Sequence, residues 1–201
     1  MIAIIDYDAG NIKSVEKAFA YLGYETKVTR DAQEILSADK VVLPGVGSFG
    51  DAMNHLKQYQ LDTVIQEVAS SGKPFLGICL GLQLLFESSE ETPGVAGLGI
   101  LPGRIVRFSD DMGLKIPHIG WNSLHLQHEG RLFRGIFEQS FVYYVHSYYL
   151  QAADESIVTA TSDYGATIHG SVESGNIFAC QFHPEKSGTV GLQILKNFCE
   201  L

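Results

Sequence analysis

The chain has 201 residues, of which 45% are hydrophobic and 18% are charged, and this balance predicts a globular protein with one domain, residues 1–201. Its formal net charge is −9 and no basic stripe is visible, which argues against nucleic acid as a partner. The N-terminus has no signal-peptide pattern and no apolar run is long enough for a membrane span. Cys79, Cys180 and Cys199 are odd in number and widely spaced, which favours free thiols and a cytoplasmic location.

The first half of the chain alternates short apolar segments with segments of helical periodicity. Strands are predicted at 2–6, 25–29, 40–43 and 74–78. Helices are predicted after Asn11, which can cap the first of them, after Asp31, across 51–70 with a possible interruption near Gln60, and at 80–87. Repeated β-α units with short connections predict a parallel sheet with helices on both faces.

After residue 95 the predicted elements are mostly strands. They cover 103–108, 115–124, 141–150, 157–162, 166–172 and 176–182. Residues 189–199 then predict a closing amphipathic helix. The expected fold class is therefore α/β, with three layers and a mixed, mostly parallel central sheet flanked by helices.

Cys79 lies in a Gly-x-Cys-x-Gly turn between a predicted strand and a predicted helix, which is the cysteine form of a nucleophile elbow. Gly77 and Gly81 suit this tight turn because a Cβ at either position would crowd it. The helix N-terminus favours a thiolate, and the amide of Leu80 is placed to donate to an oxyanion. The alternative is a buried, inert cysteine, which is the expectation for Cys180 and Cys199.

His183-Pro184-Glu185 follows the predicted strand at 176–182. A thiol nucleophile needs a base, and the base needs a third group that holds its tautomer. His183 and Glu185 suit these roles because residues i and i+2 of an extended chain point the same way, and Pro184 keeps the link extended. Alone, the motif also fits an exposed turn. Together with Cys79, it predicts a Cys–His–Glu catalytic triad.

Three glycines in the segment 44–50, Pro-Gly-Val-Gly-Ser-Phe-Gly, follow another predicted strand. They let the backbone approach a ligand, and successive N–H groups can form an anion nest. A phosphate loop is one interpretation, but no Gly-Lys-[Ser/Thr] follows. The favoured interpretation is the second half of an oxyanion hole, formed by the amides of Val46 and Gly47, with a plain turn as the alternative.

In this order, the three blocks resemble the class I (triad) glutamine amidotransferases over essentially the whole chain, from the loop at 44–50 through Gly77–Gln83 to 183–185. The resemblance implies a flavodoxin-like fold, a γ-glutamyl thioester at Cys79 and release of ammonia. It also implies that glutamine is held by Gly45, Gln83, Ser147 and Tyr148.

Further segments resemble the glutaminase subunits of imidazole glycerol phosphate synthases: 10–15, 44–50, 117–122, 144–148 and 183–187. This resemblance implies a (β/α)8-barrel cyclase partner in a heterodimer. There the ammonia would react with a ribulosyl-formimino nucleotide, giving imidazole glycerol phosphate and aminoimidazole carboxamide ribotide in histidine biosynthesis. Interface residues would be Asn11, Trp121, Asn122 and Lys186. Asp8 departs from the pattern, which usually has glycine there, but aspartate tolerates left-handed backbone.

Three alternatives to this function remain from the sequence: a same-fold γ-glutamyl cysteine hydrolase, the glutaminase subunit of another synthase, and a non-enzymatic interaction module. No cofactor is expected. No metal is expected either, because His118, His125 and His128 match no zinc spacing with partner cysteines. We also expect weak glutaminase activity without the partner, with the peptide at Val46-Gly47 misaligned until that partner binds its ligand.

Overall fold

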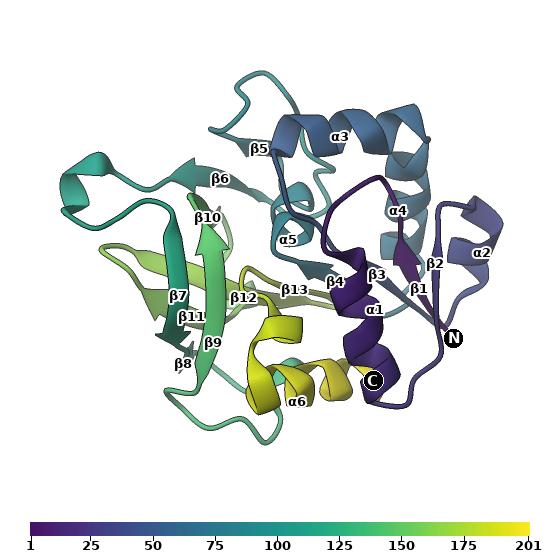
Figure 1. The fold of residues 1–201 in the computed structure, drawn as a ribbon. Coiled ribbons are helices and arrows are strands. Elements are labelled where there is room, and N and C mark those ends of the chain that lie inside the picture. Colours follow the sequence, from purple (N-terminus) through teal and green to yellow (C-terminus); the bar gives the residue numbers. More distant parts are fainter.

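The computed structural model describes residues 1–201 and centres on an eight-stranded sheet of order β2-β1-β3-β4-β13-β12-β11-β8 (Figure 1). The strands are β1 (Ile2–Ile5), β2 (Thr26–Thr29), β3 (Lys40–Leu43), β4 (Phe75–Ile78), β8 (His125–Leu126), β11 (Val158–Asp163), β12 (Thr167–Ser174) and β13 (Ile177–Cys180). The helices are α1 (Ile12–Tyr21), α2 (Ala32–Ser37), α3 (Phe49–Gln58), α4 (Leu61–Ser70), α5 (Leu80–Leu84) and α6 (Gly188–Cys199).

The pairing in the central sheet changes from parallel to antiparallel at β13. Strands β2, β1, β3, β4 and β13 pair in parallel, whereas β13, β12, β11 and β8 pair antiparallel. The parallel half comes from the β-α repeats of the first half of the chain, and the antiparallel half comes from its strand-rich end. The predicted mixed α/β sheet is therefore confirmed. The carboxyl ends of β4 and β13 lie side by side, which is where α/β sheets place their chemistry.

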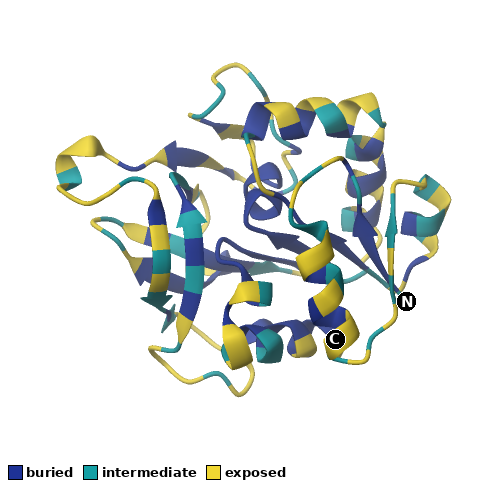
Figure 2. Cartoon of the chain, in the orientation of Figure 1, coloured by how far each residue is buried: buried dark blue, intermediate teal, exposed yellow.

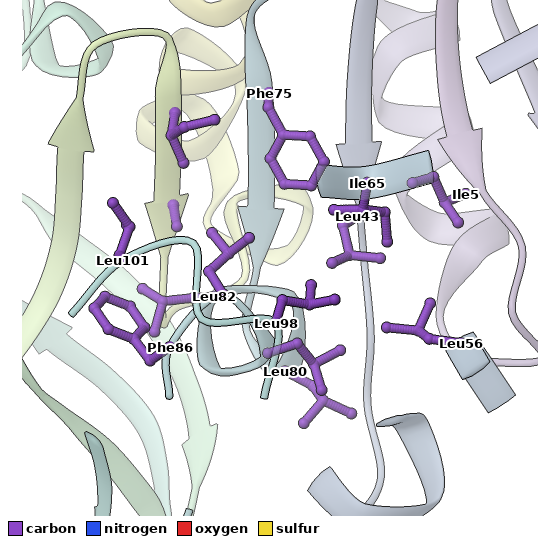
Figure 3. Close-up of a cluster of buried hydrophobic side chains, with 14 of the residues drawn as sticks. Ile5, Leu43, Leu56, Ile65, Phe75, Leu80, Leu82, Phe86, Leu98 and Leu101 are labelled. Atoms are coloured by element: carbon purple, nitrogen blue, oxygen red, sulfur yellow. The ribbon is translucent and has the colours of Figure 1, made fainter. Parts of the chain in front are cut away.

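Alternating side chains of the central strands enter two separate cores. Ala3 and Ile5 of β1 pack with α2, α3 and α4 in one cluster, part of which Figure 3 shows. Ile2 and Ile4 point the other way and pack with α1 and α6 in a second cluster. Because both faces are covered, the strands between the two helix layers are buried (Figure 2).

Two small sheets stand beside the central one. The first has the order β10-β6-β5, with β10 at Tyr148–Ala152, β6 at Gly103–Arg107 and β5 at Ser88–Ser89. The second is an antiparallel ribbon of β7 (His118–Ser123) and β9 (Phe141–His146). The chain also contains four short 3-10 helices, at Asp110–Met112, Arg131–Phe133, Glu155–Ile157 and Pro184–Lys186.

Several predicted boundaries were wrong. The single strand predicted at 141–150 is two strands in different sheets, because the chain breaks at Ser147 between β9 and β10. The helix predicted at 80–87 ends at Leu84. Asn11 precedes α1 in a left-handed conformation, but its side chain makes no capping hydrogen bond, because it is turned toward Glu185.

Candidate active site

The turn between β4 and α5 presents Cys79 in a strained conformation. Its φ is 55° and its ψ is −106°, a region that an L-residue occupies only when the surrounding structure holds it there. The flanking glycines explain how the turn fits. A Cβ on Gly81 would lie 1.8 Å from the carbonyl oxygen of Leu43, and one on Gly77 would lie 2.7 Å from the carbonyl oxygen of Gly81. Both contacts are with backbone, so no side-chain movement relieves them.

His183 and Glu185 lie beyond the end of β13, next to the Cys79 turn. Nδ1 of His183 is 2.8 Å from Oε1 of Glu185, and both side chains are fully buried. The same Oε1 accepts a hydrogen bond of 2.5 Å from Nδ2 of Asn11. Since Glu185 holds Nδ1, the other ring nitrogen, Nε2, is left without a hydrogen-bond partner and is available to exchange a proton with the thiol.

The charges around His183 favour its protonated form. Burial alone would lower the pKa of this imidazole, but the negative charge of Cys79 and Glu185 and the hydrogen bond to Glu185 outweigh it, so that the pKa is raised well above its usual range. An imidazolium held between a carboxylate and a sulfur stabilises negative charge on that sulfur.

The backbone amides near Cys79 are only partly free. The N–H of Leu80 donates to the carbonyl of Gly45 at 3.3 Å, so it is not available to an oxyanion in this conformation. The amides of Val46 and Gly47 make no hydrogen bond within the protein, and Gly47 has a φ of 111°. The donor that is blocked is thus the Leu80 N–H, whereas the sequence analysis expected the misaligned peptide at Val46-Gly47. Rotation of the peptide between Gly45 and Val46 would release the Leu80 N–H.

A cleft opens over the sulfur of Cys79. Its lining includes the three residues expected in the oxyanion hole, Val46, Gly47 and Leu80, and three of those expected to hold glutamine, Gln83, Ser147 and Tyr148. Gly45, the fourth residue expected to hold glutamine, is not among them; a Cβ at this position would lie 2.1 Å from the hydroxyl oxygen of Tyr7.

Glu91 is the one carboxylate that lines this cleft, and the sequence analysis did not single it out. Its Oε2 accepts the N–H of Phe49 at 2.7 Å, which holds the side chain in place, and its other oxygen makes no hydrogen bond within the protein. Glu91 follows the two-residue strand β5. An acidic residue in an irregular segment carries no periodic signal that would have distinguished it.

The four residues expected at a partner interface have different environments. Trp121 is 56% exposed and Lys186 is exposed. Asn122 is engaged instead, since its Nδ2 donates to the carbonyl of Asp163 at 2.9 Å. Asn11 is turned inward to Glu185. None of the helices combines the length and the apolar character that crossing a membrane requires.

The model of the glutamine amidotransferase class-I family matches residues 3–201. The chain belongs to this family. It is 57% identical over 198 residues to the imidazole glycerol phosphate synthase subunit HisH of Bacillus cereus strain G9842, covering 98% of this chain and 93% of the relative. It is 53% identical over 200 residues to the same subunit of Moorella thermoacetica, covering 100% of this chain and 94% of the relative.

Solved structures share the fold at much lower identity. A glutamine amidotransferase crystal structure aligns with 100% of this chain and 98% of its own, at a TM-score of 0.78 and 18% identity. The structure of PurLQS from Thermotoga maritima covers 99% of this chain and 97% of its own, at a TM-score of 0.77 and 21% identity. These matches support the architecture in Figure 1.

Proposed function

We propose that the whole chain, residues 1–201, is the glutaminase subunit of an imidazole glycerol phosphate synthase and acts in the cytoplasm, where its three free cysteines stay reduced. It hydrolyses glutamine to glutamate and ammonia and delivers the ammonia to a (β/α)8-barrel cyclase subunit. The observation that carries the proposal is the strained Cys79 next to the buried His183–Glu185 pair, in a chain more than half identical to HisH subunits.

The proposed reaction has two halves. In the first, His183 takes the proton of Cys79, and the sulfur attacks the side-chain carbonyl carbon of glutamine. The C–N bond then breaks, His183 returns the proton to the leaving nitrogen, and ammonia and a γ-glutamyl thioester result. In the second half, His183 removes a proton from water, which attacks the thioester and releases glutamate and the thiol. Glu185 holds the imidazole in the tautomer that this requires.

The cleft offers complementary groups for the amino-acid end of glutamine. Gln83 uses its Nε2 for hydrogen bonds within the protein, which leaves its carbonyl oxygen to accept from an ammonium group. The carboxylate of Glu91 supplies the opposite charge. Ser147 and Tyr148, at the break between β9 and β10, complete the wall on the other side.

Replacing Glu91 by glutamine is expected to raise KM for glutamine about tenfold or more with a smaller change in kcat, because the lost contact is with the substrate's ammonium group rather than the reacting carbonyl. Steady-state kinetics of the complex measures both constants. Glu87→Gln is the matched control, since Glu87 lies outside the cleft. A fall in kcat with an unchanged KM would contradict this role.

The oxyanion hole is proposed to assemble only in the complex. With the Leu80 N–H bonded to Gly45, the isolated subunit has few donors for a tetrahedral intermediate, so its turnover should be low. Exposed Trp121 and Lys186, with neighbouring Asn11 and Asn122, would contact the cyclase. Contact close to the loop at 44–50 could then favour the rotated Gly45 peptide.

Co-purification with a barrel-type cyclase tests this proposal, followed by glutamine turnover measured with and without the cyclase's nucleotide ligand. We expect a one-to-one complex whose glutaminase activity rises by orders of magnitude when the ligand binds. Full turnover by the lone subunit, or strong hydrolysis of γ-glutamyl peptides without a partner, would instead indicate a stand-alone hydrolase.

A further inference from the structure

We propose that Gln181 is a positioning residue for the nucleophile, and that its side-chain amide donates a hydrogen bond to Cys79 and stabilises the thiolate. Gln181 directly follows β13 and lies two residues before His183, so both side chains point toward the same turn. Its side chain is fully buried, and its Nε2 lies 3.7 Å from Sγ of Cys79. The chemical meaning of this contact rests on the proposed glutaminase function.

The surrounding hydrogen bonds fix which end of the Gln181 amide faces the sulfur. The carbonyl of Tyr148 can only accept, so Gln83 must present its Nε2 to it, at 3.1 Å. The same Nε2 lies 3.0 Å from the side chain of Gln181. Since Nε2 of Gln83 is a donor, Gln181 must present its oxygen there. Only the NH2 group of Gln181 is then left for Cys79.

The Tyr148 carbonyl, the first acceptor in this chain of hydrogen bonds, is itself held by a second donor. The carbonyl of Tyr148 also lies 2.9 Å from Nδ1 of His146, which must therefore be protonated. Nε2 of His146 in turn accepts from Nδ1 of His118, at 2.9 Å. Burial lowers the pKa of His146 to about 3 and that of His118 to about 4, so both rings stay neutral near pH 7 and the pattern of donors is constant.

A thiolate at Cys79 needs such a donor because little else compensates its burial. The titratable groups whose charge interacts with Cys79 are His183, Tyr7 and Cys180, and Glu91, His146 and Tyr148 line the same cleft. Burial raises the pKa of Tyr7 and of the Cys180 thiol, so at neutral pH these two carry no charge. The helix that starts at the turn, α5, has only five residues, so few peptide dipoles align on the sulfur. His183 and Gln181 are the remaining side chains that favour the charged form.

The test is the pH dependence of Cys79 alkylation by iodoacetamide in the full chain, followed by mass spectrometry of the Cys79 peptide. Gln181→Met keeps an unbranched side chain of similar size but removes the donor. We expect the pH of half-maximal alkylation rate to rise by about one unit, and the rate at neutral pH to fall about tenfold. Asn197→Leu is the matched control, since it removes a buried amide that binds the carbonyls of Leu132 and Arg134 instead.

A second variant keeps the proposal testable if Gln181→Met does not fold. Gln181→Asn keeps the amide but shortens its reach by one methylene group, and it should shift the alkylation profile in the same direction. If circular dichroism shows that either variant is folded and its alkylation profile matches that of the chain without substitutions, the proposal is wrong. The same holds if Asn197→Leu shifts the profile equally. Because alkylation needs neither glutamine nor a partner, a shifted profile in a chain whose cyclase complex lacks glutaminase activity would refute the proposed function alone.

Discussion

Replacing Cys79 by alanine is expected to lower glutamine-dependent product formation about 10⁴-fold or more in the cyclase complex, while ammonia-dependent formation stays unchanged. The sulfur is the only nucleophile on the strained turn, and alanine leaves nothing to form the thioester. Ammonia added to the medium does not need the thioester, because it reaches the cyclase without passing through this site. Parallel assays with glutamine and with an ammonium salt measure the two rates.

Cys180→Ala is the matched control for this prediction. Cys180 is also a free, buried thiol and is adjacent to Gln181, but unlike Cys79 it does not line the cleft. We expect both nitrogen sources to support nearly normal rates in this variant. If Cys79→Ala abolished both activities in a folded complex, or if Cys180→Ala abolished only the glutamine-dependent one, the assignment of the nucleophile would be wrong.

Replacing Glu185 by glutamine should lower kcat for glutamine about 10³- to 10⁴-fold with little change in KM. The carboxylate holds Nδ1 of His183 at 2.8 Å and raises the pKa of the imidazole. An amide at this position has no charge and can present its NH2 group to the ring, which favours the wrong tautomer. The pKa of His183 would fall, so less of the imidazolium that accompanies the thiolate would form near pH 7.

Another His–Glu pair in the same chain gives the control. Oε1 of Glu138 lies 3.0 Å from Nδ1 of His125, with both side chains partly exposed and no contact with the cleft. Glu138→Gln should therefore leave kcat within a few-fold of its starting value. Equal losses in Glu138→Gln and Glu185→Gln would show that the effect comes from general destabilisation and not from the orientation of His183.

The sequence carries enough information for the parallel half of the sheet and for the turn at Cys79. Short apolar strands, capped helices and glycines at fixed spacing are local patterns, and each of them predicts one local structure. Gln60 illustrates this: a possible interruption was predicted there, and it is the left-handed residue that separates α3 from α4. The break at Ser147 was missed, because residues 141–150 are β-prone throughout and only tertiary pairing divides them between two sheets.

Local sequence patterns likewise predict only part of the active site. Cys79, His183 and Glu185 stand out in the sequence because their neighbours are glycine and proline. Gln181 and Glu91 do not stand out, and Asn11 was expected at a helix cap and an interface rather than against Glu185. The contacts of these three residues join positions 42 to 174 residues apart. The bond between Leu80 and Gly45 likewise depends on the conformation of one peptide, which residue types alone do not determine.

The central claim is that ammonia leaves a thioester formed on Cys79. The most direct test is to mix the cyclase complex with glutamine, quench it in acid during turnover and weigh the Cys79 peptide by mass spectrometry. We predict a γ-glutamyl adduct on this peptide alone, with none on the peptides that contain Cys180 or Cys199, and its loss when glutamine is exhausted. Sustained glutamine turnover with an unmodified Cys79, or an adduct on another residue, would contradict the account.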